Sequence, residues 1–322
     1  MTDFQKQLIN ALQNGLPICE RPYAEIATIL RTSEQQILQQ TAELKKTGII
    51  RRIRAMINYR ALGFASTLVA VHVPESQLDA VAEAVNTLDG VSHNYLREHQ
   101  YNMWFTLQEP SESQIEATLA NLASRFGIAF HSLPVTRFFK LDVRFDAEDD
   151  ERVLLENADP VREMCKVELD HDEMTILSIL QKDLTVAPEP FAAITNDRFS
   201  YKQAFKIINN LQEKGVIRRV AGIVNHRKLG LVANAMFVAQ VHEHRIVELG
   251  RNLAHLGLVS HCYERRTFEG WHYNLFAMMH GRDMNDVQMV VTDFTDANGL
   301  ADFQLLSTVR ELKKQPVRYD IG

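Results

Sequence analysis

The sequence is an internal duplication, and no other feature restricts its fold as strongly. The segment KKTGIIRRIRAMINYRALGF aligns with QEKGVIRRVAGIVNHRKLGL at one offset of 167 residues, which places Gly48 on Gly215. The offset is 168 where His93 aligns with His261 and 174 near the C-terminus, a drift that small loop insertions explain. The chain therefore consists of two halves of about 160 residues that share one architecture.

The first part of each half has a helical pattern. Apolar residues recur at helical spacing over residues 4–12, a second helix follows Pro22, and a third extends from Ser33, its N-cap, to Gly48. The strand-like segment GIIRRIRAMIN then supplies a wing. The pattern predicts a winged helix-turn-helix over residues 1–58 and a looser copy over residues 168–225.

The rest of each half alternates strands with helices. In the first half we expect strands at 64–73, 91–97, 102–107 and 130–140, and helices at 75–88 and 111–126. This β-α-β-β-α-β order is that of a ferredoxin-like fold. Two helices cover only one face of such a sheet, and the duplication supplies a partner sheet for the other face. The predicted fold class is α+β, with ferredoxin-like domains over residues 59–147 and 226–322 and an acidic linker over residues 148–167.

Composition limits the cellular context. The chain has 322 residues, is 46% hydrophobic and 24% charged, and shows neither a run long enough to span a bilayer nor a signal-peptide pattern. Its three cysteines, Cys19, Cys165 and Cys262, form no C-x-x-C pair, so reduced structural thiols are expected. We expect a cytoplasmic protein without membrane association. The net charge of −6 does not favour nucleic-acid binding.

Each half contains one distinctive hairpin, SHNYLREHQYNMWFTL in the first and SHCYERRTFEGWHYNLFAMM in the second. Because side chains alternate along a strand, the histidine, tyrosine and arginine of each hairpin share a face. A second strand opening on Tyr-Asn would complete each hairpin, with these polar side chains on its outer face. Such a face suits an anionic, flat or metal-bearing ligand. The residues are His93, Tyr95 and Arg97 in the first copy, and His261, Tyr263 and Arg265 in the second.

A winged helix followed by a ferredoxin-like sheet resembles the leucine-responsive regulator/AsnC family. The two hairpin strings resemble, more specifically, those of siroheme decarboxylases, here with two related subunits fused head to tail. This resemblance implies removal of two acetate carboxyl groups from siroheme, giving didecarboxysiroheme for haem d1 or an alternative haem pathway. It also implies that the sheet domains pair face to face around a substrate cleft. No cofactor is implied, because the substrate carries its own iron.

Siroheme has eight carboxylates, which fixed guanidinium groups would bind bidentately. Each candidate also has a structural alternative: the wing arginines would contact DNA phosphates or solvent, the tryptophan would belong to the core, and the asparagines would close the hairpin turns. The candidate substrate-binding residues are Arg51, Arg52, Arg54, Arg137, Arg218, Arg219, Arg310, His99, His272, Asn102, Asn274 and Trp104.

Loss of CO₂ from a pyrrole acetate requires a proton for the ring or for the nascent methyl group. His93 and His261 are the leading acids, because imidazole titrates near neutral pH. Tyr95 and Tyr263 would hold or relay protons, and the two hairpin arginines would orient carboxylates. Alternatively, His93 or His261 is an axial ligand to the substrate iron, a role that needs a neutral imidazole, or either histidine makes only a structural hydrogen bond.

The sequence leaves two alternative functions open. In the first, the chain is an AsnC-like transcription regulator that senses a small metabolite; in the second, it is a non-catalytic haem- or porphyrin-binding protein. The first recognition helix, SEQQILQQTAELKK, carries two glutamates and no arginine, so DNA is not an expected partner. Siroheme is the expected small-molecule partner, and the possible protein partners are a second copy of the chain or other haem-pathway enzymes.

Overall fold

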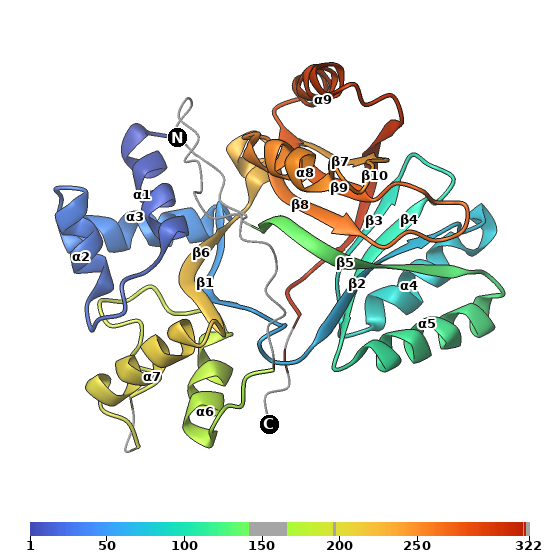
Figure 1. The fold of residues 1–322 in the computed structure, drawn as a ribbon. Helices are drawn as coiled ribbons and strands as arrows, with labels where there is room; N and C mark the ends of the chain where they lie inside the picture. Colours follow the sequence, from blue (N-terminus) through green and yellow to red (C-terminus); the bar gives the residue numbers. More distant parts are fainter. Residues whose placement is uncertain (142–165, 196–197, 318, 320–322) are drawn as a thin grey trace.

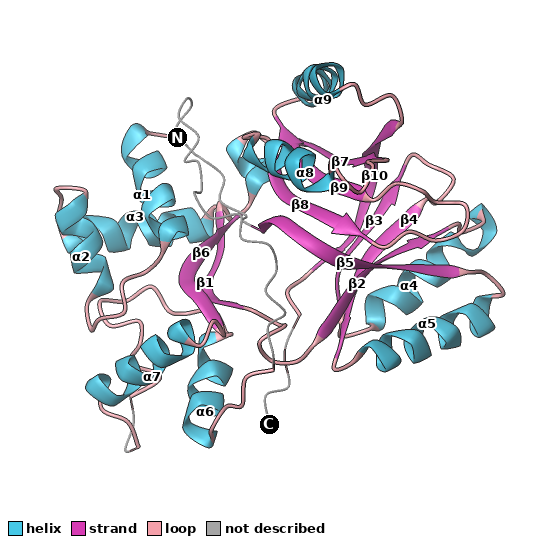
Figure 2. Cartoon of the chain, viewed as in Figure 1, coloured by secondary structure: helices cyan, strands magenta, loops and turns pink. Residues whose placement is uncertain are grey.

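The computed structural model describes residues 1–141, 166–195, 198–317 and 319. Figures 1 and 2 show two lobes, one built from the helix-turn-helix units and one built around a large β-barrel. Most of the predicted linker at 148–167, together with Cys165, lies outside the described residues.

The first helix-turn-helix has the three helices expected from its capping signals. They are α1 (Asp3–Asn14), α2 (Pro22–Ile29) and α3 (Glu34–Lys46). The Ser33 hydroxyl accepts a hydrogen bond from the Gln36 amide, and Gly48 adopts a positive φ of 72° after the last turn. The wing is strand β1 (Ile50–Ile57).

The second helix-turn-helix is less regular, as its sequence predicts. It contains α6 (His171–Leu180), α7 (Tyr201–Glu213) and wing strand β6 (Ile217–Val224), and between α6 and α7 the described residues form turns. The two wings pair with each other as an antiparallel ribbon. Two equivalent backbone hydrogen bonds flank this ribbon. The Asn58 amide donates to the Val216 carbonyl and the Asn225 amide donates to the Ile49 carbonyl, both at 2.8 Å. One apolar core joins the two units.

Both ferredoxin-like units have the expected element order, so the predicted fold class is confirmed. The first comprises β2 (Ala65–Val71), η1 (Glu75–Gln77), α4 (Leu78–Thr87), β3 (Val91–Arg97), β4 (Met103–Glu109), α5 (Glu112–Phe126) and β5 (Phe130–Leu141). After the short helix η2 (His226–Leu229), the second comprises β7 (Ala233–Ala239), α8 (Ile246–His255), β8 (Val259–Arg265), β9 (Leu275–Gly281), α9 (Met284–Asn298) and β10 (Phe303–Lys314).

The two sheets do not stay separate but close into one eight-stranded barrel, in the order β10-β3-β4-β2-β5-β8-β9-β7. Strand β5 pairs with β2 through its first part and with β8 of the other half through its second part. Strand β10 does the same with β7 and β3. The prediction of a polar outer face on each hairpin is therefore wrong, because barrel closure turns that face into the interior.

The helices cover the outside of the barrel, where α4 and α5 enclose one apolar core and α8 and α9 enclose another. A third apolar cluster fills the inside, with Trp104, Phe276 and Trp271 among its members. The barrel thus has a filled interior, and the end nearer the wings is the end where His93 and His261 lie.

The second part of β5 pairs with the sheet of the second half and packs against α8. Gly250 is the fifth residue of α8, and a Cβ there would lie 2.3 Å from Cε2 of Phe139 on β5. We expect Gly250→Ala to destabilise the protein by about 1–3 kcal/mol, despite alanine's better helix propensity. Thermal denaturation would measure the change.

The first half supplies the matched control, because the equivalent positions of α4 and β10 hold Ala82 and Leu312. Adding Phe139→Leu to Gly250→Ala should recover most of the lost stability. Equal stability of Gly250→Ala and the parent protein would show that the aromatic ring moves aside without cost.

Candidate active site

Two rows of side chains lead into the barrel from its mouth, the end nearer the wings. The first row is His93, Tyr95 and Arg97 on β3, and the second row is His261, Tyr263 and Arg265 on β8. Residues two apart on a strand are separated by about 6.6 Å, so each histidine, tyrosine and arginine of a row lies successively deeper. The histidines are half-buried, whereas Arg97 and Arg265 are only 4% and 8% exposed. The structure therefore brings the six predicted catalytic residues into one barrel interior.

The two histidines are held in the same way. Ser92 Oγ lies 2.8 Å from His93 Nδ1, and Ser260 Oγ lies 2.9 Å from His261 Nδ1. The Ser260 hydroxyl donates to the Met278 carbonyl at 3.3 Å, so it accepts the Nδ1 proton of His261. That arrangement leaves the lone pair of His261 on Nε2.

Each tyrosine is close to the arginine that follows it in its row. The guanidinium carbon of Arg97 is 5.4 Å from the ring centre of Tyr95, and that of Arg265 is 4.9 Å from the ring centre of Tyr263. Burial raises the pKa of Tyr95 to about 12 and also raises the pKa of Tyr263. Both phenols are therefore protonated at neutral pH and can act as hydrogen-bond donors.

Arg97 and Arg265 are buried cations, and no anionic side chain within the described part of the chain pairs with either of them. Arg97 Nη1 donates to the Leu306 carbonyl at 2.9 Å, and Arg265 Nη1 donates to the Leu133 carbonyl at 2.8 Å. Among the described residues, neither guanidinium has a carboxylate within ion-pair distance, and neither Nε has a hydrogen-bond partner. Burial lowers the pKa of each to about 10, so both remain charged at pH 7. A buried, unpaired charge is costly, and a bound anion would relieve that cost.

Cations and imidazoles from other elements surround the first row. Burial, followed by the charges of Lys314, His261, Arg51 and His226, lowers the pKa of His93 to about 3. The ring centres of His226 and His280 are 4.5 Å apart. At neutral pH His93 is therefore a neutral imidazole.

The second row has a different surrounding. Arg60 stacks over Phe138 at 4.2 Å, and Phe138 makes an edge contact with Tyr263 at 5.3 Å. The Tyr319 hydroxyl donates to Gln108 Oε1 at 2.9 Å. The charge of Arg218 also reaches Tyr263 and Tyr319.

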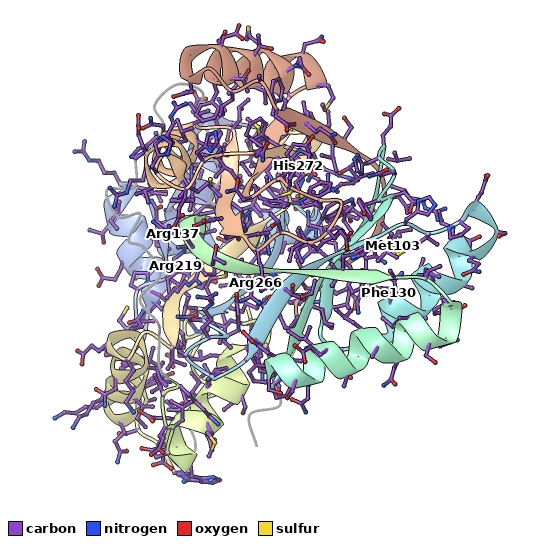
Figure 3. All side chains as sticks on the ribbon, turned by 45° about the vertical axis from the view of Figure 1, so that its right-hand side comes forward. Met103, Phe130, Arg137, Arg219, Arg266 and His272 are labelled. Carbon is purple, nitrogen blue, oxygen red and sulfur yellow. The ribbon has the colours of Figure 1, made fainter. Side chains whose placement is uncertain are left out.

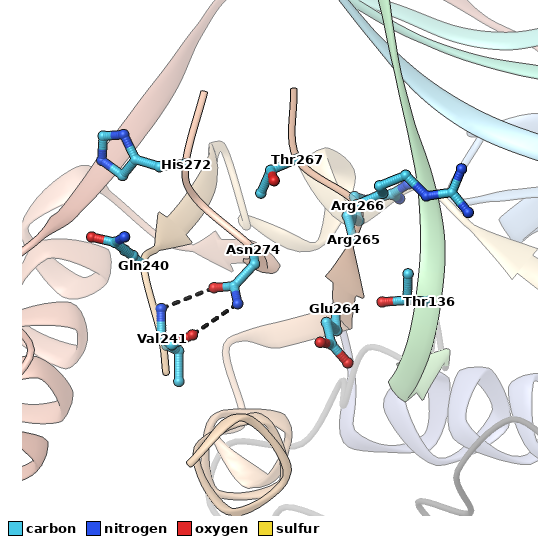
Figure 4. Close-up of a pocket in the computed structure, with 9 residues that line it drawn as sticks. All are labelled: Thr136, Gln240, Val241, Glu264, Arg265, Arg266, Thr267, His272 and Asn274. Carbon is cyan, nitrogen blue, oxygen red and sulfur yellow. Dashed lines mark hydrogen bonds between the residues drawn. The ribbon is translucent and has the colours of Figure 1, made fainter. Parts of the chain in front are cut away.

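The structure shows the hairpin asparagines in structural positions. Asn102 exchanges two side-chain hydrogen bonds, both 2.9 Å, with the backbone of Val73. Asn274 does the same with Val241 at 2.9 and 2.8 Å, as Figure 4 shows. Each second strand begins one residue after its asparagine, not at the Tyr-Asn pair as expected. The asparagine side chains instead bond the segments that follow β2 and β7.

His99 and His272 lie at the far end of the barrel, whereas Trp104 lies in the interior opposite Tyr95. The ring of His99 is 5.5 Å from that of Trp271, and the Trp104 indole donates to the Tyr101 carbonyl at 2.6 Å. His272 is half exposed, and its Nε2 lies 2.9 Å from a carboxylate oxygen of Asp302. These contacts do not bring the three residues to the mouth with His93 and His261.

The remaining arginines are divided between two regions. Arg137 pairs with Glu264 at 3.2 Å and Arg310 with Asp79 at 3.3 Å, both opposite outward-facing positions of the barrel. Figure 3 shows Arg137 nearer the wings than Phe130 at the other end of β5. Arg52, Arg54, Arg218 and Arg219 are on the wing ribbon, where Arg54 donates to the Gln181 carbonyl at 3.4 Å.

An open pocket of about 440 Å³ lies at the far end of β8, beside the loop that precedes β9 (Figure 4). Its polar groups include Arg266, Glu264 and the already bonded amide of Asn274. It is lined by Thr136, Gln240, Val241, Glu264, Arg265, Arg266, Thr267, His272 and Asn274.

Sequence reasoning missed four polar residues around the first row: His226, His280, Glu311 and Lys314. A signal for one of them was present, because His226 directly follows Asn225, which the duplication aligns with Asn58. Lys314 and Glu311 face the first row only through pairing of β10 with β3. That pairing joins strands about 200 residues apart and has no local sequence signature.

The buried histidines predict acid sensitivity. Burial lowers the pKa of His93 and His226 to about 3 and that of His280 well below its usual value. Below pH 6.5 the unfolded chain takes up protons that the folded chain does not, so stability falls as the pH drops from 6.5 towards 3. Each such histidine is expected to cost about 1.4 kcal/mol by pH 5.5.

Urea unfolding at pH 7.5 and pH 5.5 measures this loss, with His226→Gln as the comparison. The variant should lose less stability between the two pH values than the parent chain. Equal losses would indicate that His226 is protonated in the folded protein.

Among the described residues, no group of three or more His, Cys, Asp or Glu side chains is arranged to hold a metal ion. Within the same residues, no helix has the length and apolar character needed to cross a bilayer.

Two family models match the chain. One, described as AsnC-like ligand binding domain, matches residues 61–140 and 228–313. The other, described as siroheme decarboxylase NirDL-like HTH domain, matches residues 5–51.

Relatives extend the match to nearly the full length. Siroheme decarboxylase of Hydrogenobacter thermophilus is 35% identical over 320 residues, covering 98% of this chain and 95% of that protein. The siroheme decarboxylase NirDL subunit of Paracoccus denitrificans is 32% identical and covers 91% and 89%. The siroheme decarboxylase alpha subunit of Desulfovibrio desulfuricans is 42% identical but covers only 47% of this chain and 87% of its own length, as expected for a fusion of two subunits.

Solved structures agree. The crystal structure of the siroheme decarboxylase NirDL superposes with a TM-score of 0.76 at 31% identity, over 99% of this chain and 94% of that one. A crystal structure of NirDL in co-complex with an iron-uroporphyrin III analogue gives a TM-score of 0.75, over 98% and 94%. The fold, the duplicated hairpins and the full-length relatives together lead to one conclusion: this chain belongs to the siroheme decarboxylase family.

Proposed function

We propose that the chain removes two acetate carboxyl groups from siroheme, giving didecarboxysiroheme for haem d1 or an alternative haem pathway. The proposal rests on the barrel mouth, where both hairpins present the same three polar groups to one interior. A relative with the same architecture has been solved with an iron-uroporphyrin III analogue.

The observation that carries the proposal is the pair of buried guanidiniums. Arg97 and Arg265 are charged, almost fully buried and without a carboxylate partner among the described residues. A substrate with several carboxylates supplies the missing anions, and the planar guanidinium fork orients them bidentately. The two arginines therefore act as anchors that set which side chains of the macrocycle reach the reactive groups.

Neutral imidazoles lie nearer the mouth than these anchors. His93 is uncharged in the free protein because of burial and the cations around it. Bound carboxylates would offset these positive charges and raise its pKa, so binding increases the fraction of His93 that is protonated and able to act as a general acid. His261 presents an Nε2 lone pair, which suits it to the substrate iron or to accepting a proton.

The helix-turn-helix units act as a scaffold. Their wings are paired with each other, and Arg51 and Arg218 extend from this ribbon towards the two rows. We infer that DNA binding is at most weak and salt-sensitive, since the chain is acidic overall.

No resident cofactor is part of the proposed reaction, since decarboxylation needs protons and no oxidant. A cytoplasmic location, a homodimer and contacts with other haem-pathway enzymes stay predictions.

The test is anaerobic incubation of the full chain with siroheme, followed by chromatography of substrate, mono- and didecarboxylated products. Appearance of both products with release of two CO₂ per siroheme is the expected result. Tight binding of siroheme without any product would favour a porphyrin-binding protein, and binding of duplex DNA in its place would favour a regulator.

A further inference from the structure

The two rows are related by the duplication, yet their neighbours differ in chemistry. On β10, Thr308, Glu311 and Lys314 lie opposite Arg97, Tyr95 and His93. Residues paired directly across a ladder project to the same side of the sheet, so these three polar side chains share the interior face with the first row. The ladder beside the first row is thus fully polar.

The equivalent ladder, between β5 and the second row on β8, carries apolar residues at the corresponding positions. On β5, Val135 lies opposite Arg265 and Phe138 opposite Tyr263. On the other flank, Met278 of β9 lies opposite His261, where the first row has Thr106 of β4 opposite His93. The two halves therefore differ on the ladder that joins them, where polar side chains of β10 face the first row and apolar side chains of β5 face the second. At the middle of each hairpin the partner is aromatic in both halves, Trp104 opposite Tyr95 and Phe276 opposite Tyr263.

The covering residues show the same asymmetry. His226 follows the second wing at the position that Tyr59 occupies after the first wing, and His280 of β9 corresponds to Gln108 of β4. His226 and His280 carry imidazoles, which can take up a proton at one ring nitrogen and release one from the other, whereas Tyr59 and Gln108 carry none.

A continuous polar chain connects the first row to these imidazoles. Arg97 donates to Thr308 at 3.1 Å, Thr308 donates to Asn234 at 3.0 Å, and Asn234 is 3.5 Å from His280. His280 in turn is in ring contact with His226. At the position equivalent to Thr308, the second half has Val135, which can neither donate nor accept.

We propose that proton transfer takes place only beside the first row, with Lys314 as the donor and with Glu311 and the neutral imidazole of His226 passing on the proton that renews it, while the second row and its apolar flank hold the macrocycle. This inference rests on the proposed decarboxylase function and assigns unlike tasks to the two halves of the fold.

The proton balance of the reaction explains why such a relay is needed. In each step the bond between the methylene and carboxyl carbons breaks, CO₂ leaves, and the bonding electron pair stays on the methylene carbon. One proton then forms the new C–H bond of the methyl group. Two acetates consume two protons, so the donor must be reprotonated between steps.

Lys314 is suited to be that donor. Its ammonium group is 4.0 Å from Glu311, which also pairs with Arg227 at 3.6 Å. Burial lowers the pKa of Lys314 to about 8, so the group is protonated at neutral pH but gives up its proton more easily than a solvated lysine.

The experiment compares Lys314→Met, Lys314→Arg and Glu311→Gln in the full chain, under anaerobic single-turnover conditions with siroheme. Lys314→Arg keeps the positive charge but removes the transferable proton, because guanidinium does not deprotonate in this range. We expect both Lys314 variants to slow product formation by about 10²-fold or more. Siroheme binding, followed by absorbance titration, should change less in Lys314→Arg than in Lys314→Met.

Added ethylamine should restore part of the turnover of Lys314→Met, which a purely structural lysine would not permit. The controls are Lys313→Met, at the neighbouring lysine that points out of the barrel and donates to the Asn86 and Leu88 carbonyls, and Tyr59→Phe. Both should leave the rate of product formation within a few-fold of the parent. Full activity of Lys314→Arg, or loss of activity in the two controls with Lys314→Met unaffected, would overturn the assignment. An inactive parent chain would instead refute the proposed function.

Discussion

Replacing His93 by alanine is expected to lower siroheme turnover by about 10²–10⁴-fold, the usual effect of losing a general acid. Binding should be largely retained, because the anchoring guanidiniums lie deeper in the barrel and donate to the Leu306 and Leu133 carbonyls, whereas this imidazole bonds Ser92. Rates of the first and second decarboxylation, resolved by chromatography, measure the effect.

His261→Ala is the matched variant, since Ser260 holds that imidazole as Ser92 holds His93. If His261 Nε2 binds the substrate iron, its loss should change the absorbance spectrum of bound siroheme together with affinity, whereas loss of a proton donor should leave the spectrum unchanged. Unaltered rates of both steps in both variants would remove the histidines from the mechanism.

The second large effect concerns the buried guanidiniums. Replacing Arg97 by methionine removes a charge that burial disfavours, so we expect the free protein to be as stable as the parent or more stable. Siroheme binding should nevertheless weaken by at least about tenfold, because charge-assisted hydrogen bonds contribute about 1.5–3 kcal/mol each. Stability and affinity would thus change in opposite directions.

Thermal denaturation of the free protein and absorbance titration with siroheme test the two parts separately. Arg265→Met should behave in the same way, and Arg137→Met is the control, since Arg137 is half exposed and paired with Glu264. A loss of stability in Arg97→Met without any loss of affinity would show that this arginine holds the barrel together and does not meet substrate.

The local order of the chain could be derived from sequence because its signals are local. Apolar periodicity, the Ser33 cap and the positive-φ position of Gly48 determine where the first helices begin and end. The alternation of side chains along a strand determines that His93, Tyr95 and Arg97 share a face, but it does not determine what packs against that face. The duplication then transfers each of these conclusions to the second half.

The environment of that shared face was decided only by tertiary structure. Strands β5 and β10 each change partner midway and close the barrel, which turns an expected outer surface into an interior. The same closure brings Lys314 beside His93. Such pairings depend on contacts between residues far apart in the chain, which no periodicity of two or 3.6 residues encodes.

For the candidate site, the sequence by itself determined the chemistry of the two rows, and the tertiary structure determined their depth, their partners and their inequality. Asn102 and Asn274 show the difference plainly, because an amide suits a ligand carboxylate and a backbone group equally well. Only the positions of Val73 and Val241 decide between the two. Burial acts in the same manner on Arg97 and Arg265, since an exposed guanidinium and a buried one have the same sequence letter but differ greatly in the cost of remaining unpaired.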